Sequence, residues 1–379
     1  MSTGSPRVAV LWARLSGYVH ASLRALADQG AEVLVFHREP EADAPFDHGV
    51  VGTGLRAHTW TDDADGAVIE AALADFDPHA VVINSWHRKA YRRAGRALRG
   101  RSLRILAMDN QWLGTPKQWV GVLTAPALLR PVYDAVFLPG STQAEFARRL
   151  GFPAERTLWG LYSCDYPTFQ AVAARRGATV LPEAFLFVGR LVPSKGVDVL
   201  AEAYRRYRAH EPDPWPLVVA GTGPEEALLR DVPGVEVLGF TQPDDLPAVY
   251  QRSGCLVLPS RFEPWAVVIH EAAAAGLPVV CSSACGASTR LVLDGYNGVV
   301  VTPGDAGGLA HALTRIHRST DHERRAMSQA SQLLARQFTP DRWARHLLGR
   351  LPELRAAIGL PPAPWQHAST TAGTAAGVA

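Results

Sequence analysis

Cysteine is scarce in this 379-residue sequence, which has only Cys164, Cys255, Cys281 and Cys285. Two of them, Cys281 and Cys285, lie close together, but no second pair and no histidines stand at a spacing that binds zinc. The sequence therefore predicts neither a disulfide framework nor a zinc site, and we expect reduced thiols in a cytoplasmic protein.

Long apolar runs and an excess of one charge are also missing. No segment approaches the roughly 18 apolar residues that would span a membrane. The first apolar run, VAVLWA, is shorter than a signal-peptide core and is interrupted at Arg14. Lysine and arginine number 38 against 36 aspartates and glutamates. These features predict neither a membrane-spanning segment nor a nucleic-acid-binding protein.

What the sequence has instead is a regular alternation of short β-rich runs and helical patterns, which is typical of parallel sheets with crossover helices. The expected strands are 7–13, 31–37, 80–85, 103–108 and 134–139 in the first half, and 184–189, 216–221, 235–240, 254–260, 277–282 and 298–303 in the second. The expected fold class is α/β, with two Rossmann-like, doubly wound domains that face each other across a cleft. Ligands are expected at the carboxyl ends of the strands.

The predicted domain boundaries follow the two series of strands. An N-terminal, acceptor-side domain of residues 1–165 is followed by a hinge at 166–183, where no clear period is present. The second, donor-binding domain covers 184–340, and a helix at 341–360 is expected to pack back on the first domain. The tail at 361–379, rich in alanine and threonine, is expected to be disordered.

Two basic residues follow the first strand of the second domain. Arg190 and Lys195 stand in the loop of FVGRLVPSKGVDVLAEA, before a helix that begins near Gly196. Two cations and the free N–H groups of a helix start favour an anion such as a diphosphate. An ordinary solvated loop is the alternative, and the residues alone leave both interpretations open.

The segment RFEPWAVVIHEAAAAGLPVV places Glu263 and Glu271 among apolar residues. Pro264 is typical of a first helical turn and Gly276 of a helix end, so Glu263 is expected at the mouth of a helix, where it can act as a cap. Glu271 has apolar neighbours at helical spacing, and burying its carboxylate costs about several kcal/mol unless hydrogen-bond donors meet it. Eight helical residues would separate the glutamates by roughly 12 Å, so the pair could hold both ends of a nucleotide-sugar.

Metal binding is not predicted by the remaining motifs. His270 precedes Glu271, but Ala274 stands where a zinc-binding H-E-x-x-H motif has its second histidine. We interpret His270 as a packing or hydrogen-bonding residue, with a catalytic base as the alternative. The D-x-D run at 63–65 is interpreted as a helix cap rather than a metal site.

Five motifs, in order, resemble the retaining nucleotide-sugar glycosyltransferases of family 4 (group 1 type), which have the GT-B fold. They are FVGRLVPSKGVDVLAEA, VVAGTGPEEALL, VEVLGF, EPWAVVIHEAAAAGLPVV and DGYNGVVVTPGD, within residues 184–305. The first half resembles the family only in its alternation of strands and helices.

The resemblance implies a role for each matched residue. Arg190 and Lys195 would hold the donor diphosphate, Glu271 would bind the ribose hydroxyls, and Glu263 would lie beside the transferred sugar. The backbone from Trp265 to Val267 would reach the sugar hydroxyls and the phosphate. Family members transfer the sugar with retention by front-face attack and stabilise the leaving diphosphate electrostatically, so the resemblance implies neither a cofactor nor a metal.

A few positions depart from the family pattern. After the first strand, ARLSGYVH keeps only Gly17 of a Gly-Gly loop that lets the backbone approach the phosphates. Trp265 and Ala266 replace Phe-Gly, and Arg290 stands where glutamate is common. Asp109 stands in a loop where a histidine is frequent, and it could accept the acceptor's proton, bind a sugar hydroxyl or cap its own loop. These differences concern specificity rather than reaction class.

The segment 87–104 carries eight lysines and arginines and no acid. Tyr91, Ala94 and Leu98 would give a helix here an apolar stripe. Such a helix could lie on the inner face of an anionic membrane or receive a lipid-diphosphate acceptor, and a solvated helix face is the alternative. Trp112 and Trp119 offer planes for sugar stacking or for core packing.

The sequence thus predicts a cytoplasmic retaining glycosyltransferase. It would transfer a hexose-type sugar from a nucleotide-diphosphate sugar to a glycan, lipid-linked or small-molecule acceptor in polysaccharide or glycoconjugate biosynthesis. Two alternatives stay open: a nucleotide-sugar epimerase with the GT-B fold, and a catalytically silent subunit of a transferase.

Overall fold

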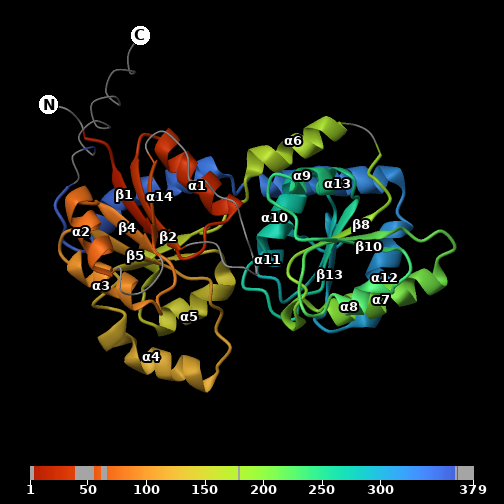
Figure 1. Ribbon diagram of the computed structural model, residues 1–379, viewed down its shortest axis with the longest axis horizontal. Helices are drawn as coiled ribbons and strands as arrows, with labels where there is room; N and C mark the ends of the chain where they lie inside the picture. Colours follow the sequence, from red (N-terminus) through yellow and green to blue (C-terminus); the bar gives the residue numbers. More distant parts are fainter. Residues whose placement is uncertain (1–3, 39–54, 61–65, 178–179, 363–364, 366–379) are drawn as a thin grey trace, which may run out of the picture. The chain divides into compact units, whose positions relative to one another are not determined.

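The computed structural model describes residues 4–38, 55–60, 66–177, 180–362 and 365. The chain divides into two compact units, the first made of Met1–Tyr162 with Pro340–Ala379 and the second of Ser163–Thr339. In the described part of each unit a parallel sheet carries helices on its two faces (Figure 1). The predicted α/β class with two Rossmann-like domains is confirmed.

The described sheet of unit 1 has the strand order β3-β2-β1-β4-β5-β6-β7, with parallel pairing throughout. Its strands are β1 (Arg7–Leu11), β2 (Glu32–Arg38), β3 (Leu55–Trp60), β4 (Ala80–Ile83), β5 (Leu103–Ala107), β6 (Ala135–Leu138) and β7 (Thr157–Trp159). Its helices are α1 (Gly17–Asp28), α2 (Gly66–Phe76), α3 (Lys89–Ala97), α4 (Pro116–Leu128), α5 (Ala144–Arg149) and α14 (Pro340–Ala356), with short 3₁₀ turns η2 (Ser141–Gln143) and η3 (Ala154–Arg156).

The five strands predicted for the first half are confirmed, but β3 and β7 were not predicted. Four of the six residues of β3 are exposed, so it lacks the continuous apolar run that marked the other strands. Strand β7 has only three residues. An exposed edge strand and a very short one give little sequence signal.

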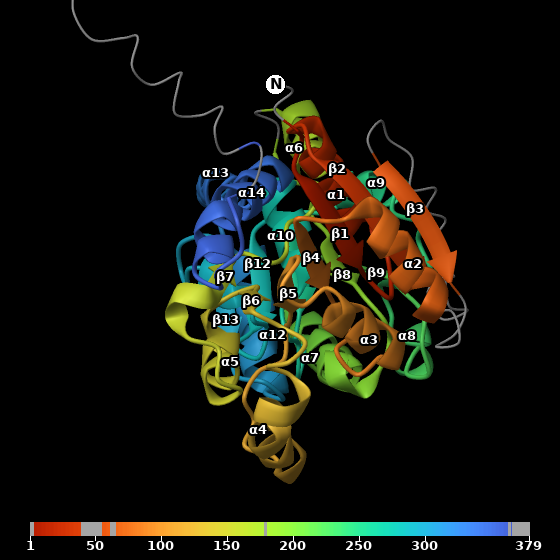
Figure 2. The same ribbon diagram turned by 90° about the vertical axis from the view of Figure 1, so that its left-hand side faces the viewer.

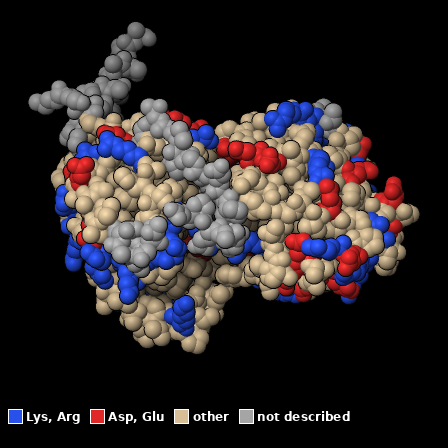
Figure 3. Space-filling model, in the orientation of Figure 1, with Lys and Arg blue, Asp and Glu red and all other residues tan. Residues whose placement is uncertain are grey.

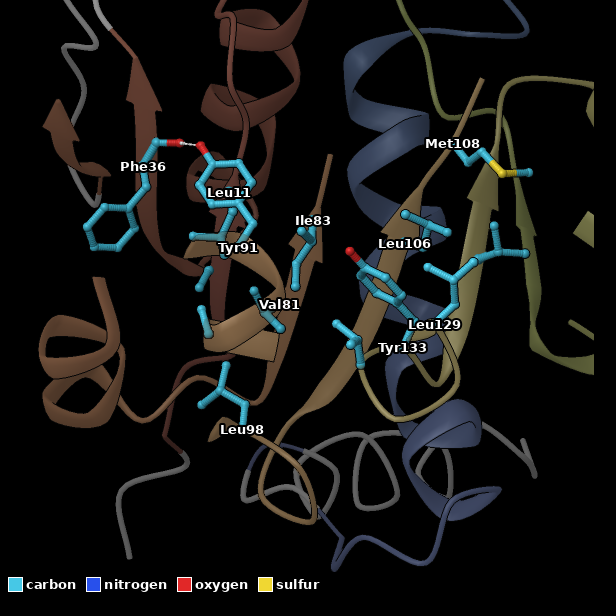
Figure 4. Close-up of a cluster of buried hydrophobic side chains, with 14 of the residues drawn as sticks. Leu11, Phe36, Val81, Ile83, Tyr91, Leu98, Leu106, Met108, Leu129 and Tyr133 are labelled. Carbon is cyan, nitrogen blue, oxygen red and sulfur yellow. Dashed lines mark hydrogen bonds between the residues drawn. The ribbon is translucent and has the colours of Figure 1, made fainter. Parts of the chain in front are cut away.

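Helices α1 and α14 pack together on one face of this sheet, and α2 and α3 pack together on the other (Figures 1 and 2). Alternate residues of the strands, such as Leu11, Phe36 and Ile83, form a buried core under α2 and α3. Figure 4 shows this core, in which the Tyr91 hydroxyl donates a hydrogen bond of 3.3 Å to the carbonyl of Phe36. The core fixes the sheet whose carboxyl edge carries Asp109.

The prediction of one basic helix with an apolar membrane-facing stripe at 87–104 is wrong. The helix ends at Ala97, and the segment continues into β5. Tyr91, Ala94 and Leu98 are all buried in the core, because α3 uses its apolar side to cover the sheet. No apolar stripe is left on α3 for a membrane.

One basic residue of that segment, Arg104, is buried in an ion pair. Its Nε and Nη2 donate to the two carboxylate oxygens of Asp134 at 2.8 and 2.6 Å. Its Nη1 donates to the carbonyls of Pro131 at 2.6 Å and Gly95 at 3.3 Å. Arg104 therefore ties β5 to the chain before β6 and to α3.

The described sheet of unit 2 has the order β10-β9-β8-β11-β12-β13, again with parallel pairing. Its strands are β8 (Phe185–Val188), β9 (Leu217–Ala220), β10 (Val235–Gly239), β11 (Cys255–Leu258), β12 (Val279–Ser282) and β13 (Gly298–Val301). Its helices are α6 (Tyr166–Arg176), α7 (Val197–His210), α8 (Ala227–Arg230), α9 (Leu246–Gln251), α10 (Val267–Ala274), α11 (Ser288–Leu291), α12 (Ala306–His317) and α13 (Asp321–Ala335), with a 3₁₀ turn η4 (Pro193–Lys195). All six strands predicted for the second half are confirmed.

The predicted hinge at 166–183 is mostly helical. Residues Tyr166–Arg176 form α6, which packs against α9 and α10 within unit 2. No clear apolar period marks this helix in the sequence, because one of its four buried positions is occupied by a charged residue, Arg176. The chain passes between units after Tyr162 and after Thr339.

The remaining predictions fall partly outside the described residues. The D-x-D run at 63–65 lies outside them, as does most of the tail at 361–379. Of that tail, Trp365 packs against His79, with 4.3 Å between ring centroids. Among the helices that the structure describes, none combines the length and apolarity required to cross a bilayer.

Candidate functional site

The candidate site of unit 2 lies where the strand order reverses. Strand β8 pairs with β9 on one side and with β11 on the other, so the loops after β8 and β11 leave the same edge of the sheet in diverging directions. Open parallel sheets bind ligands in the crevice at such a point. The loops there carry Arg190, Lys195 and Glu263.

The loop after β8 holds both predicted cations. Arg190 is exposed directly after the strand, and Lys195 ends η4. Gly196 then has φ +67°, and a Cβ there would lie 2.4 Å from the carbonyl oxygen of Pro259. Glycine is required by both the left-handed backbone and this close approach. Helix α7 starts at the next residue, Val197, as predicted.

Hydrogen bonds attach this loop to the loop after β11. The carbonyl of Ser194 accepts from the N–H groups of Arg261 at 2.8 Å and Phe262 at 3.1 Å. The Arg261 guanidinium pairs with Asp198 at the start of α7, with Nη2 2.6 Å from Oδ2, and this bond lowers the pKa of Asp198. The two loops are thereby held in one arrangement.

Within that arrangement Lys195 and Glu263 form an ion pair between Nζ and Oε2. The two side chains are only 17% and 13% exposed, so water screens the pair less than it screens a surface pair. The structure thus brings together two residues that are 68 positions apart and that the sequence analysis assigned to one donor.

The prediction that Glu263 caps a helix beginning near Pro264 is wrong. Helix α10 starts at Val267, and Glu263 instead forms a backbone bridge with Cys285. The carbonyl of Glu263 accepts from the N–H of Gly286 at 3.0 Å. Because residues 263–266 are not helical, the helical rise used to estimate the separation of the two glutamates does not apply.

Ala266 has φ +81° and ψ +75°, in the left-handed region that favours glycine. The chain therefore keeps the backbone conformation suited to the glycine of the family pattern, although alanine occupies the position. Trp265 beside it is 3% exposed, so its indole packs inside unit 2. Val267 follows as the first helical residue, and its N–H has no acceptor within the helix, as at any helix start.

Glu271 lies one turn before the end of α10 and is half-buried. Its Oε2 accepts a 2.9 Å hydrogen bond from the hydroxyl of Tyr250, at the end of α9. Desolvation raises the pKa of Glu271 to about 7, the Tyr250 hydrogen bond acts in the opposite direction, and nearby Asp165 raises it further. Within the described chain Oε1 has no hydrogen-bond partner, so it can accept from a ligand.

Tyr250 and its support were missed by the sequence analysis. The Tyr250 ring is fully buried, and its position in LPAVYQ looks like that of any core aromatic residue. Arg176 of α6 donates to the carbonyl of Tyr250 at 3.0 Å and to that of Ala275 at 2.9 Å. It thereby fixes the ends of the two helices that carry Tyr250 and Glu271.

His270 is a structural residue of α10. Its Nδ1 accepts from the N–H of Cys164 at 3.1 Å, so its Nε2 carries the proton and donates to the carbonyl of Ala335 at 3.0 Å. Burial lowers the pKa of His270 to about 4. Both ring nitrogens are used within the fold, which agrees with the interpretation of His270 as a hydrogen-bonding residue.

The predicted residues of unit 1 lie at the carboxyl edge of its sheet. Asp109 follows β5 by two residues, and its Oδ2 accepts from the Tyr162 hydroxyl at 2.9 Å. The Tyr162 ring also contacts Tyr18 edge-on, with 5.5 Å between centroids. Gly17, the first residue of α1, immediately precedes Tyr18. Asp109 and the start of α1 are therefore linked through Tyr162.

Two parallel-sheet units with this topology define the GT-B class of fold. Sucrose-phosphate synthase from Thermosynechococcus elongatus matches with a TM-score of 0.71 and 19% identity, over 93% of this chain and 100% of that chain. HepE from Anabaena, solved with UDP and glucose, matches with a TM-score of 0.69 and 19% identity, over 92% of this chain and 100% of that chain. At this identity the likeness shows the fold alone.

Sequence comparisons point to a family. Residues 182–319 match the family model described as glycosyl transferases group 1. Glycogen synthase from Mycobacterium tuberculosis is 29% identical over 291 residues, 75% of this chain and 64% of that protein. D-inositol 3-phosphate glycosyltransferase from Salinispora tropica is 35% identical over 205 residues, 49% of this chain and 42% of that protein. These matches support the group 1 glycosyltransferase family and the predicted enzyme class.

The chain spans 64% of the glycogen synthases and 42% of the inositol 3-phosphate glycosyltransferase that it matches. The family model covers residues of unit 2, so the support is centred on the part of the chain that contains Lys195, Glu263 and Glu271. The activity of the whole protein, its substrates and its partners are therefore proposals.

Proposed function

We propose that the protein is a retaining glycosyltransferase of family 4. In this proposal it transfers a hexose-type sugar from a nucleoside-diphosphate sugar to a glycan, lipid-linked or small-molecule acceptor, in polysaccharide or glycoconjugate biosynthesis. The proposal rests on the ion pair between Lys195 and Glu263. It lies at the point where the strand order of the unit 2 sheet reverses, near the first turns of α7 and α10. A cation and two helix starts at one edge favour a diphosphate.

The two ends of the donor would be held by different elements. Arg190 and Lys195 would bind the diphosphate, and the Val267 N–H at the start of α10 would bind a phosphate or sugar oxygen. Glu263 would accept from a hydroxyl of the transferred sugar once the diphosphate competes for Lys195. In Glu271, Oε2 accepts from the Tyr250 hydroxyl, and Oε1 would accept hydrogen bonds from the ribose hydroxyls.

The reaction breaks the bond between the anomeric carbon and the diphosphate oxygen and forms a bond from that carbon to the acceptor oxygen on the same face. The acceptor's proton passes to the departing diphosphate or to a nearby base. Arg190 and Lys195 would stabilise the negative charge that develops on the leaving group. Such electrostatic stabilisation is usually the largest single contribution to the rate enhancement of an enzyme.

Unit 1 would supply the acceptor contacts. Asp109, oriented by Tyr162, would bind an acceptor hydroxyl or accept its proton. Gly17 at the start of α1 would instead contact the donor, by letting the backbone come close to a donor phosphate. The four cysteines are all free thiols, which supports a cytoplasmic site of action.

A thermal-shift screen against UDP-, GDP- and ADP-sugars, followed by product analysis with mixed acceptors, tests the proposal. A bound donor at about 100 times its Kd should raise the melting temperature of unit 2 by about 5–10 °C. Donor hydrolysis or epimerisation without any transfer product would indicate the epimerase instead. The absence of binding to any nucleoside diphosphate would indicate a silent subunit.

Donor affinity is expected to depend on pH through Glu271. Its pKa of about 7 means that the carboxyl is protonated below that pH and ionised above it. The ionised form accepts hydroxyl hydrogen bonds more strongly, so affinity for an intact nucleotide-sugar should rise about tenfold between pH 6 and 8. Titration calorimetry across this range measures it, and Glu271→Gln should remove the pH dependence. An equally steep profile in Glu271→Gln would contradict the assignment.

Removing the Tyr250 hydroxyl is expected to move the rise in donor affinity to higher pH. Tyr250→Phe deletes the hydrogen bond that lowers the pKa of Glu271, so a larger fraction of Glu271 is protonated at pH 7. Donor binding at pH 7 should weaken by about tenfold, in line with a hydrogen bond to a charged group. Tyr204→Phe, which removes a buried hydroxyl bonded to the carbonyl of Trp215, is the matched control and should leave the profile unchanged.

A further inference from the structure

Helix α4 of unit 1 exposes apolar residues that no part of the described chain covers. It begins after Thr115, whose side chain accepts from the N–H of Gln118 at 3.3 Å, and Pro116 occupies its first position. Only Ala125 of its thirteen residues is buried. In Figures 1 and 2, α4 projects from the rest of unit 1. The helix is thus well formed but contributes little to the core.

The exposed large apolar residues of α4 are Trp119, Val120, Leu123 and Leu128. Trp119, Val120, Leu123 and Ala127 recur at helical spacing, and Ala125 lies on the opposite side. Leu123 is 77% exposed and Val120 60%. A helix on a globular protein normally turns its polar side outward, so this orientation is the reverse of the usual one. We call Leu113, Trp119, Val120, Leu123 and Leu128 the α4 surface.

The Trp119 ring is partly exposed but makes defined contacts with two neighbouring side chains. Its ring meets Trp112 edge-on, with 5.2 Å between centroids, and the Arg149 guanidinium lies 5.3 Å from its centroid. The same guanidinium lies 4.5 Å from the Trp112 ring. An aromatic ring with a cation beside it suits the boundary between water and an apolar phase.

The charged residues of α4 and of the segments next to it in sequence are of one sign. No aspartate or glutamate occurs between Asp109 and Asp134, whereas Lys117 and Arg130 are both exposed. On the face drawn in Figure 3, the surface formed by α4 is tan with blue side chains and no red.

We propose that the α4 surface docks the protein on an anionic lipid bilayer. Leucine, valine and tryptophan side chains would enter the boundary between headgroups and acyl chains, while Lys117 and Arg130 would meet the lipid phosphates. The membrane contact first expected at 87–104 is thereby reassigned to α4.

The uniform charge favours a bilayer over a second copy of the chain. A symmetric dimer would bring the same patch of both copies together, so the basic residues around one α4 surface would face those around the other. Like charges at such an interface repel, and Glu145 of α5 is already paired with Arg149 at 2.6 Å. An anionic bilayer offers the complementary charge.

Co-sedimentation of the full chain with phosphatidylcholine vesicles, with and without phosphatidylglycerol, tests the proposal without any donor or acceptor. The parent protein should bind the anionic vesicles. Leu123→Asp should weaken that binding by about tenfold or more, as expected for the loss of a buried leucine. Lys117→Glu changes the charge near the surface by two and should weaken the binding by roughly 30-fold at low salt.

Leu333→Asp is the matched control, because Leu333 is an exposed leucine of α13 in unit 2. It should bind the anionic vesicles like the parent. Leu123 makes little contact with the core, so Leu123→Asp should keep the parental melting temperature. A parent that binds neither type of vesicle would overturn the proposal. So would light scattering that shows a parental dimer which Leu123→Asp converts to a monomer. Because vesicle binding requires no nucleotide-sugar, its failure would leave the proposed activity unaffected.

Discussion

Replacing Lys195 with methionine is expected to lower glycosyl transfer by about 100- to 1,000-fold while the protein stays folded. Lys195 pairs with Glu263 at the carboxyl edge of β8 and β11. In the proposed reaction the same ammonium group stabilises the diphosphate as the bond to the sugar breaks. Methionine keeps most of the aliphatic stem but carries no charge, so the expected loss is of charge stabilisation rather than of packing.

Arg206→Ala is the matched control for Lys195→Met. Arg206 lies on the same helix that follows the Lys195 loop, and it forms an exposed ion pair with Glu202 at 2.8 Å. Exposed pairs contribute about 1 kcal/mol or less, so this variant should keep the turnover of the parent. Steady-state kinetics with the donor found in the screen measures both variants. Near-parental turnover by Lys195→Met would remove Lys195 from the proposed mechanism.

Replacing Asp134 with alanine is expected to destabilise unit 1 by about 3–5 kcal/mol. Asp134 is the only carboxylate that pairs with Arg104 within the described residues, and the Arg104 side chain is 4% exposed. Removing the acid leaves a charged guanidinium in a nearly water-free environment. The melting temperature of unit 1 should therefore fall by about 6–20 °C in scanning calorimetry.

Two further variants distinguish the effect of leaving the buried Arg104 charge unpaired from the effect of removing a carboxylate in general. Glu32→Ala removes the carboxylate of an exposed pair with Arg56 in the same unit, at 3.8 Å, and should change stability by about 1 kcal/mol or less. The double variant Arg104→Met, Asp134→Leu should recover most of the loss, because an apolar pair leaves no charge buried. Equal melting temperatures for Asp134→Ala and Glu32→Ala would show that the buried pair has no special role.

The fold could be predicted because its strands are buried on both faces. Runs such as those of β1 and β11 are apolar along nearly their whole length, which identifies them without any tertiary information. Strand β3 could not be found in this way, since its outward residues are polar and exposed. The basic segment at 87–104 was misjudged for a related reason: its apolar residues were identified correctly, but sequence alone does not say whether they face a core or a membrane.

The sequence allowed individual residues of the site to be predicted, but not the contacts between them. Lys195 and Glu263 were singled out separately, and their contact depends on the pairing of β8 with β11 rather than on local pattern. The start of α10 was misplaced because Pro264 normally indicates a first turn, whereas the left-handed Ala266 delays the helix to Val267. Tyr250 could not be recognised, because a buried tyrosine that positions a carboxylate has the same sequence signal as one that fills a core.

Titration calorimetry of UDP-, GDP- and ADP-sugars into the parent protein and into Glu271→Ala measures whether the protein binds a nucleotide-sugar through Glu271. At least one nucleotide-sugar should bind the parent, and Glu271→Ala should weaken this binding by about tenfold or more, as expected when hydrogen bonds to a charged acceptor are lost. Absence of binding by every nucleotide-sugar, or equal affinity for the parent and Glu271→Ala, would contradict this prediction.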